Sequence, residues 1–252
     1  MTGDGENVIG MNASRSITPR NNRVDSPSPI VVLCGPTAAG KSTLAGRLAE
    51  AAELASADST APGPTTDEQR LADLALLRAL EGPCVVESTT LPHLLPVDNH
   101  ALVVRLTAST PVRARRLRRR VPEMSRTEAH HLLDLADATT HRRLRSSWGI
   151  DLATPASRWR TDLILGCPDQ QACTDETACT DTVAALLTAA FRVYVGYLAG
   201  HDALALFTRI RRAHPAYIRR CGPALIGPVR EFTAAAWRTR THTELERRAG
   251  LL

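Results

Sequence analysis

The sequence predicts an α/β fold, a doubly wound and mostly parallel sheet of about five strands with helices on both faces. Two observations support this prediction. Short apolar runs typical of buried strands alternate with segments of helical spacing, which favours parallel strands joined by right-handed crossovers. The first apolar run leads directly into a glycine-rich loop and then a helix. A chain of 252 residues with 43% hydrophobic content can bury one full core.

The predicted elements follow in order along the chain. Residues 1–29 offer almost nothing to bury and are interpreted as a disordered leader. In the domain that follows, residues 30–199, apolar runs predict strands at 30–34, 53–57, 84–87, 101–106 and 162–165. Helical spacing predicts helices at 42–49, 66–80, 111–120, 125–146 and 183–198. Residues 200–252 are interpreted as a C-terminal extension with helices at 202–214 and 229–248.

The glycine-rich loop reads Gly35-Pro36-Thr37-Ala38-Ala39-Gly40-Lys41-Ser42, the G-x-x-x-x-G-K-[ST] spacing of a phosphate-binding P-loop. Lys41 is the only lysine among 31 basic residues, at a position that needs a compact ammonium to reach the β- and γ-phosphates. The backbone N–H groups of such a loop and the N-terminus of the helix that follows it form a binding site for an anion. We therefore expect a nucleoside triphosphate with Mg²⁺ on the Ser42 hydroxyl, bound by Gly35, Thr37, Ala38, Ala39, Gly40, Lys41, Ser42 and Thr43.

Two further segments are expected beside the P-loop, because carboxyl ends of parallel strands meet at one edge of a sheet. Asp58 and Ser59 follow the second strand, while Glu87 ends the third and Thr89 lies just beyond it. Asp58 is either a turn aspartate or the base that accepts a proton from a substrate hydroxyl. Glu87 would be costly to bury without a partner, so we expect it to hold Mg²⁺ through water or to contact substrate.

Residues 111–147 form an arginine-rich pair of helices, opened in its second half by a capping box over residues 125–128, and are expected to act as a lid. Most of these arginines are interpreted as a solvated helix face. One or two of them are expected to close over the phosphates, from the set Arg113, Arg116, Arg120, Arg142 and Arg143, with Arg116 and Arg143 as the catalytic candidates. The run lacks interleaved aromatics, so a nucleic-acid partner is not expected.

Composition limits the remaining possibilities. The net charge is +5, and the six cysteines without an apolar leader favour reduced thiols and a cytoplasmic protein. The spacing of Cys167, Cys173 and Cys179 matches no common zinc pattern. Arg192 interrupts the apolar helix at 183–198, so a buried helix is favoured over a membrane partner. The C-terminal helices are expected either to cover the mouth of the site or to form a homodimer contact.

Residues 85–165 resemble the cytidylate kinases, particularly their shorter archaeal-type relatives among the nucleoside monophosphate kinases. The similar residues are the segments 103–116 (VVRLTASTPVRARR), 148–152 (WGIDL, like the family's Tyr-Gly-Ile-Asp motif) and 161–165 (TDLIL, like its Tyr-Asp-Leu-Val-Ile strand). With the P-loop, the resemblance covers roughly residues 30–190. It implies a P-loop kinase fold with strand order 2-3-1-4-5, Mg·ATP as donor, and a monophosphate acceptor between the second and third strands.

This chain departs from the family at two acceptor-site positions. Glu87-Ser88-Thr89 stands where the family has Glu-Gly-Arg, and the family's Arg-Glu-Glu falls near Leu135-Ala136-Asp137. The resemblance implies transfer of the γ-phosphoryl group of ATP to CMP or a modified pyrimidine nucleotide. The two absent arginines keep open a metabolite or antibiotic hydroxyl kinase with Asp58 as base. A nucleotide-binding regulatory protein without turnover is the third alternative.

Overall fold

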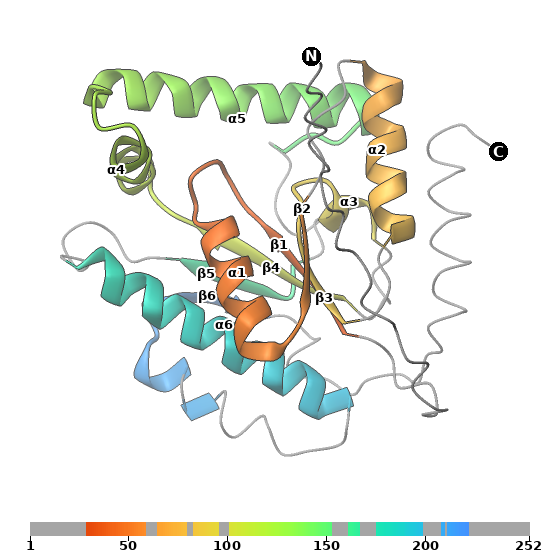
Figure 1. Cartoon of the computed structure of the whole chain (residues 1–252), viewed down its shortest axis with the longest axis vertical. Helices are drawn as coiled ribbons and strands as arrows, with labels where there is room; N and C mark the ends of the chain where they lie inside the picture. Colours follow the sequence, from red (N-terminus) through yellow and green to blue (C-terminus); the bar gives the residue numbers. More distant parts are fainter. Residues whose placement is uncertain are drawn as a thin grey trace, which may run out of the picture.

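The computed structural model describes residues 29–58, 65–79, 83–95, 101–152, 161–166, 175–198, 208–209 and 211–221. A six-stranded sheet in the order β2-β3-β1-β4-β5-β6 forms its centre (Figure 1). The strands are β1 (Ile30–Cys34), β2 (Ala55–Asp58), β3 (Cys84–Glu87), β4 (Ala101–Thr107), β5 (Leu163–Gly166) and β6 (Ile218–Cys221). The first five are parallel, so the predicted fold class and the order 2-3-1-4-5 are confirmed.

Strand β6 was not predicted. It pairs antiparallel with β5, so the C-terminal extension adds a strand to the sheet where only helices were expected. Residues 208–209 and 211–213 are helical, within the helix predicted at 202–214. Residues 1–28 of the leader predicted at 1–29, and the helix predicted at 229–248, lie outside the described residues.

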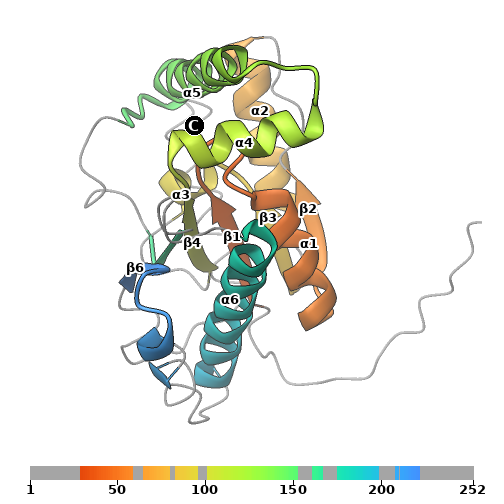
Figure 2. The same ribbon diagram turned by 90° about the vertical axis from the view of Figure 1, so that its left-hand side faces the viewer.

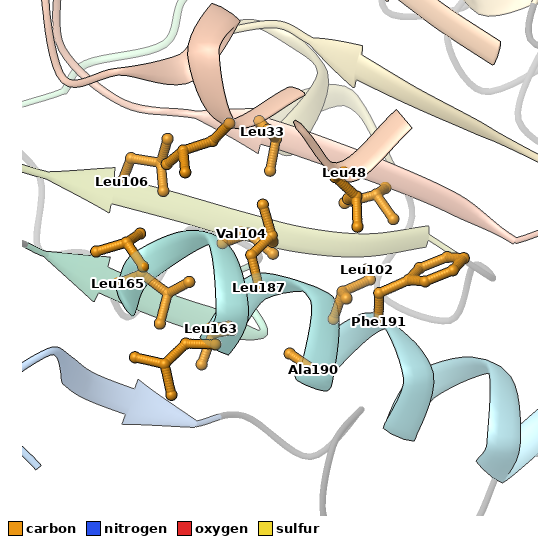
Figure 3. Packing of buried hydrophobic residues seen from close by; sticks show 14 of the residues in the cluster. Leu33, Leu48, Leu102, Val104, Leu106, Leu163, Leu165, Leu187, Ala190 and Phe191 are labelled. Atoms are coloured by element: carbon orange, nitrogen blue, oxygen red, sulfur yellow. The ribbon is translucent and has the colours of Figure 1, made fainter. Parts of the chain in front are cut away.

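Helices cover both faces of the sheet. They are α1 (Lys41–Ala52), α2 (Thr66–Ala79), the unpredicted short α3 (Leu91–Leu94), α4 (Thr110–Arg120), α5 (Arg126–Trp148) and α6 (Glu176–Leu198). Successive strand residues point to opposite faces. Val31 and Leu33 of β1 therefore pack with side chains of α1 and α6, while Ile30 and Val32 pack with α2 and α3. Figure 3 shows the first of these cores around Leu33.

Helix α6 is a core helix. The segment Glu176–Val195 is long and apolar enough to cross a membrane by length and composition. Its side chains Leu186, Leu187 and Ala190 are fully buried against the sheet, as Figure 3 shows for the last two. This packing agrees with the sequence prediction of a buried helix.

Helices α4 and α5 are the predicted arginine-rich helix pair, and Figure 2 shows both crossing one end of the molecule, with α4 beside the loop that follows β1. Their action as a lid stays a prediction. The predicted capping box opens α5: Glu128 N donates to Ser125 Oγ, and Ser125 N donates to Glu128 Oε2. Ala129 of α5 packs on Ala114 of α4. At the far end of α5, Trp148 Nε1 donates to the buried Asp73 of α2 over 2.8 Å. The helix is therefore anchored at both ends.

The cysteines differ in part from expectation. Cys34 and Cys84 are free and buried. Cys179 is disulfide-bonded, so the expectation of reduced thiols is wrong at this residue. Cys167 and Cys173 lie outside the described residues.

Candidate active site

The P-loop adopts a conformation that its glycines make possible. Gly35 and Gly40 have φ of 143° and 99°, in the region that favours glycine. A Cβ at Gly35 would lie 2.4 Å from the Leu106 carbonyl oxygen, so the loop can approach β4 this closely only without a side chain. Ala38 also has a positive φ, of 60°, which is uncommon for a residue other than glycine. The loop is thus held in the strained shape typical of a functional segment.

Lys41 folds back over the mouth of the loop. Its Nζ donates to the carbonyl oxygens of Gly35 at 3.1 Å and Pro36 at 3.0 Å. These contacts hold the ammonium group beside the loop amides that are expected to bind phosphate. Lys41 therefore lies at the mouth of the loop, and its role as a phosphate ligand stays a prediction.

Ser42 and Glu87 were both expected at the edge of the sheet where the parallel strands end, and the structure places them in contact. Ser42 Oγ donates to Glu87 Oε2 over 2.9 Å, and Glu87 is 8% exposed at the end of β3. The parallel pairing of Leu33 with Glu87 places this carboxylate beside the P-loop. Mg²⁺ is usually bound by one or two protein oxygens together with phosphates and waters. A hydroxyl and a carboxylate in contact fit that requirement.

Two arginines of α4 hold the P-loop through its carbonyl groups. Arg113 Nη1 donates to Thr37 O at 3.2 Å and to Asp137 Oδ2 at 2.7 Å. Arg116 Nη1 donates to Ala39 O at 2.7 Å. With their carbonyls held by guanidinium groups, Thr37 and Ala39 are fixed within the loop. Arg116 contacts the loop carbonyls, and its role as a phosphate ligand stays a prediction.

Glu176, which the sequence did not single out, holds Arg116 in turn. Its carboxylate is 7% exposed in the first turn of α6 and accepts from Arg116 Nε at 2.7 Å. Arg115, at 3.6 Å, and Arg119 also pair with it. A chain of contacts thus runs from α6 through Arg116 to the P-loop.

Arg143 of α5 reaches the segment after β3. Its Nη2 donates to Thr89 Oγ1 over 3.3 Å, which joins two residues that the sequence proposed separately. Arg142 and Arg120 are exposed. Arg143 therefore contacts the segment after β3, and Arg120 lines a cavity on the other side of the P-loop.

A cavity of about 390 Å³ lies between β3, β4, α3 and α5; we call it the acceptor-side cavity. Lys41, Glu87, Thr89 and Asp137 line it, together with Arg105 and His93, which the sequence analysis missed. Arg105 could have been found from the alternation of β4, because Ala101 and Val103 on the same face belong to the buried core. A charged side chain on such a buried face indicates a site.

Two titratable groups of this cavity are kept uncharged. Burial, aided by the charge of Arg105, lowers the pKa of His93 to about 4, so its imidazole is neutral at pH 7. Burial raises the pKa of the Cys34 thiol to about 12, against the opposing charges of Arg105 and Lys41. Cys34 is thus a thiol at neutral pH and unsuited to act as a nucleophile.

A second cavity, also of about 390 Å³, lies on the other side of the P-loop between α4 and α6; we call it the donor-side cavity. Ala38, Gly40 and Thr43 line it from the loop and α1, and Arg116 and Glu176 line it from the helices. Thr37 lines both cavities. The P-loop therefore separates two spaces of similar size.

Of the remaining predicted residues, Asp58 ends β2, where its backbone is in register with Glu87. The strand thus brings Asp58 to the predicted edge of the sheet. The Asp58 side chain and Ser59 lie outside the described residues, so their substrate roles stay predictions.

Comparison with known proteins gives distant likenesses only. No family model and no curated protein matches the chain. The chain is similar to an uncharacterized protein from Eubacterium ventriosum, at 12% identity and a TM-score of 0.46 over 62% of this chain and 97% of that one. It is similar to a shikimate kinase from Bacteroides thetaiotaomicron (16%, TM-score 0.40, 64% and 96%) and a gluconokinase from Sinorhizobium meliloti (19%, TM-score 0.37, 66% and 95%).

Proposed function

We propose that this protein is an ATP- and Mg²⁺-dependent kinase of a small molecule. The observation that carries the proposal is the pair of cavities that meet at the P-loop. Each has a volume of about 390 Å³, within the range of small-molecule sites. A triphosphate on the loop amides would extend its nucleoside into the donor-side cavity and its γ-phosphate toward the acceptor-side cavity.

The chain's own residues account for the transfer. The loop amides and Lys41 would bind the β- and γ-phosphates, for which Lys41 exchanges its two carbonyl partners. Ser42 and Glu87 would hold Mg²⁺, which neutralises phosphate charge when bound. The acceptor oxygen would then form its bond to the γ-phosphorus as the bond to the bridging oxygen breaks, and ADP leaves. The lid helices α4 and α5 exclude water during this step.

The first candidate acceptor is a nucleoside monophosphate, CMP or a modified pyrimidine nucleotide. The resemblance to cytidylate kinases supports it. Arg105 lines the acceptor-side cavity with Lys41, and Arg143 reaches Thr89 at the position where the family carries its own arginine. These cations can offset the repulsion between an acceptor phosphate and the γ-phosphate. An acceptor that is already an oxyanion needs no general base.

The second candidate acceptor is the hydroxyl of a metabolite or antibiotic. The carboxylates of Glu87 and Asp137 line the acceptor-side cavity together with Thr89, Thr140 and Thr161, a lining suited to hydrogen-bonding a polyhydroxylated molecule. Asp58 would serve as the base in this case.

Calorimetry with ATP and Mg²⁺, followed by ADP release with paired acceptors, tests the proposal. CMP is the phosphate acceptor of this panel, and cytidine, gluconate and glucose are its hydroxyl acceptors. Lys41→Ala should abolish turnover, and Lys41→Arg, which keeps the charge but not its compact shape, should restore little of it. Turnover with CMP alone supports the first acceptor, and turnover with alcohols that Asp58→Asn abolishes supports the second. ATP binding without turnover would favour a regulatory protein, and the absence of ATP binding would refute the proposal.

We also propose that the kinase works in the cytoplasm without nucleic-acid or membrane partners. Residues 200–252 are the proposed homodimer contact. Sedimentation of the full chain tests this contact, since a monomer at all concentrations would contradict it.

A further inference from the structure

The lid helix α5 is tied to the P-loop by one carboxylate. Asp137 Oδ1 accepts from the Thr37 backbone N–H at 3.4 Å, and Asp137 Oδ2 accepts from Arg113 Nη1 at 2.7 Å. The same Arg113 nitrogen donates to Thr37 O at 3.2 Å. Asp137 thus bridges an amide and a carbonyl-bound guanidinium at the edge of the loop, and it lines the acceptor-side cavity with Lys41.

The partners of Asp137 are groups that suit a phosphate. The Thr37 N–H belongs to the run of loop amides expected to surround phosphate oxygens. A guanidinium binds carboxylate and phosphate oxygens with the same geometry. Arg113 is 6% exposed, and its buried Nε has no hydrogen-bond partner within the described part of the chain. The Arg113 guanidinium therefore has a further N–H donor, at Nε, for an anion that is larger than the Asp137 carboxylate, such as a phosphate.

The contact is not needed to hold α5 in place. Ala129 and Leu133 pack on Ala114 of α4 near the start of the helix, and Trp148 binds Asp73 at its end. Asp137 lies between these anchors, and its side chain is 36% exposed. Its carboxylate can therefore turn toward solvent while the helix stays docked.

We propose that Asp137 occupies the position of the γ-phosphate in the empty site. When ATP binds, the γ-phosphate replaces the Asp137 carboxylate as the partner of the Thr37 N–H and the Arg113 guanidinium. This inference rests on the proposed function. A carboxylate in this position repels the γ-phosphate and competes with it for Arg113. ADP has no γ-phosphate and leaves the contact intact. Asp137 is thus a positioning residue that keeps Arg113 ordered in the empty site, and it lowers the affinity for ATP relative to ADP.

Calorimetric titration of Asp137→Asn with Mg·ATP and Mg·ADP tests the inference. Asparagine can still accept from Thr37 but carries no charge. We expect ATP to bind at least about fivefold more tightly than to the wild type, the lower end of coupling between sites, and ADP to change by less than about twofold. Asp134→Asn is the matched control, because Asp134 is exposed one turn earlier on α5. It should change neither affinity.

Three results would overturn the inference. Asp137→Asn could weaken ATP binding, change ATP and ADP binding equally, or behave like Asp134→Asn; in each case the proposed function stands, since nucleotide still binds. Failure of the wild type to bind ATP would remove the proposed function and the inference together. Thermal unfolding shows whether each variant is folded, and Asp137→Ala repeats the test if the asparagine variant is not.

Discussion

Replacing Glu176 with glutamine tests the contact chain behind the P-loop. Removal of one member of a buried ion pair costs about 3–5 kcal/mol when the other charge stays buried. Among the partners of Glu176, the Arg116 side chain is 19% exposed, whereas those of Arg115 and Arg119 are 37% and 60% exposed. Water can solvate the last two, and glutamine still accepts from Arg116. We therefore expect a loss of about 2 kcal/mol in the free energy of unfolding.

Urea unfolding measures this loss, and a thermal scan should show a decrease in Tm of about 4–8 °C for a domain of this size. A second readout separates positioning from stability. Because Arg116 holds the Ala39 carbonyl, we expect ATP to bind about tenfold more weakly to folded Glu176→Gln protein, a difference of about 1.4 kcal/mol. Glu123→Gln, an exposed acid between α4 and α5, is the control. Equal unfolding free energies and ATP affinities for the two variants would refute the reasoning.

Three further predictions concern the loop, the metal and the pH dependence. Gly35→Ala should lower the free energy of unfolding, measured in urea, by about 3 kcal/mol, because the φ of Gly35 and a β4 carbonyl leave no room for Cβ. Gly46 lies in open space on α1, so Gly46→Ala should raise this free energy by about 1 kcal/mol. Similar values for both variants would contradict the loop geometry. Glu87→Gln should raise the Mg²⁺ concentration for half-maximal ADP formation about tenfold while keeping the contact with Ser42, and an unchanged Mg²⁺ curve would exclude Glu87 from the metal site. His93 has a pKa of about 4 when folded and 6.5 as a reference, so the unfolded chain binds more protons between these values and stability falls as pH drops from 6.5 to 4. The loss is at most about 3 kcal/mol, and a His93→Asn variant whose unfolding free energy has the same pH dependence would argue against it.

The parallel part of the fold could be predicted from the sequence because its signals are local. Each buried strand is a short apolar run, and the P-loop motif fixes the order strand, loop, helix. Strand β6 carries no comparable signal. Its four residues, Ile218–Cys221, include two arginines, and the strand forms through pairing with β5 more than fifty positions earlier in the chain.

The site likewise contains residues that local sequence signals predict and residues that they do not. The contact between Ser42 and Glu87 follows from the motif and from the end of an apolar strand, so sequence reasoning could place both residues. Asp137 and Glu176 each stand on a helix among other polar residues, and nothing local distinguishes them. Their partners are a hundred residues away at Thr37 and sixty residues away at Arg116. Such pairings depend on how α4, α5 and α6 dock.

The solitary ammonium group over the loop gives the protein a built-in chemical reporter. Reagents that acylate amines have one lysine side chain to modify in this chain, and it is Lys41. The extent of acylation, read by mass spectrometry on the peptide that contains it, would measure directly how often the loop is shielded by nucleotide. The same reaction would leave the thirty arginines of the chain untouched.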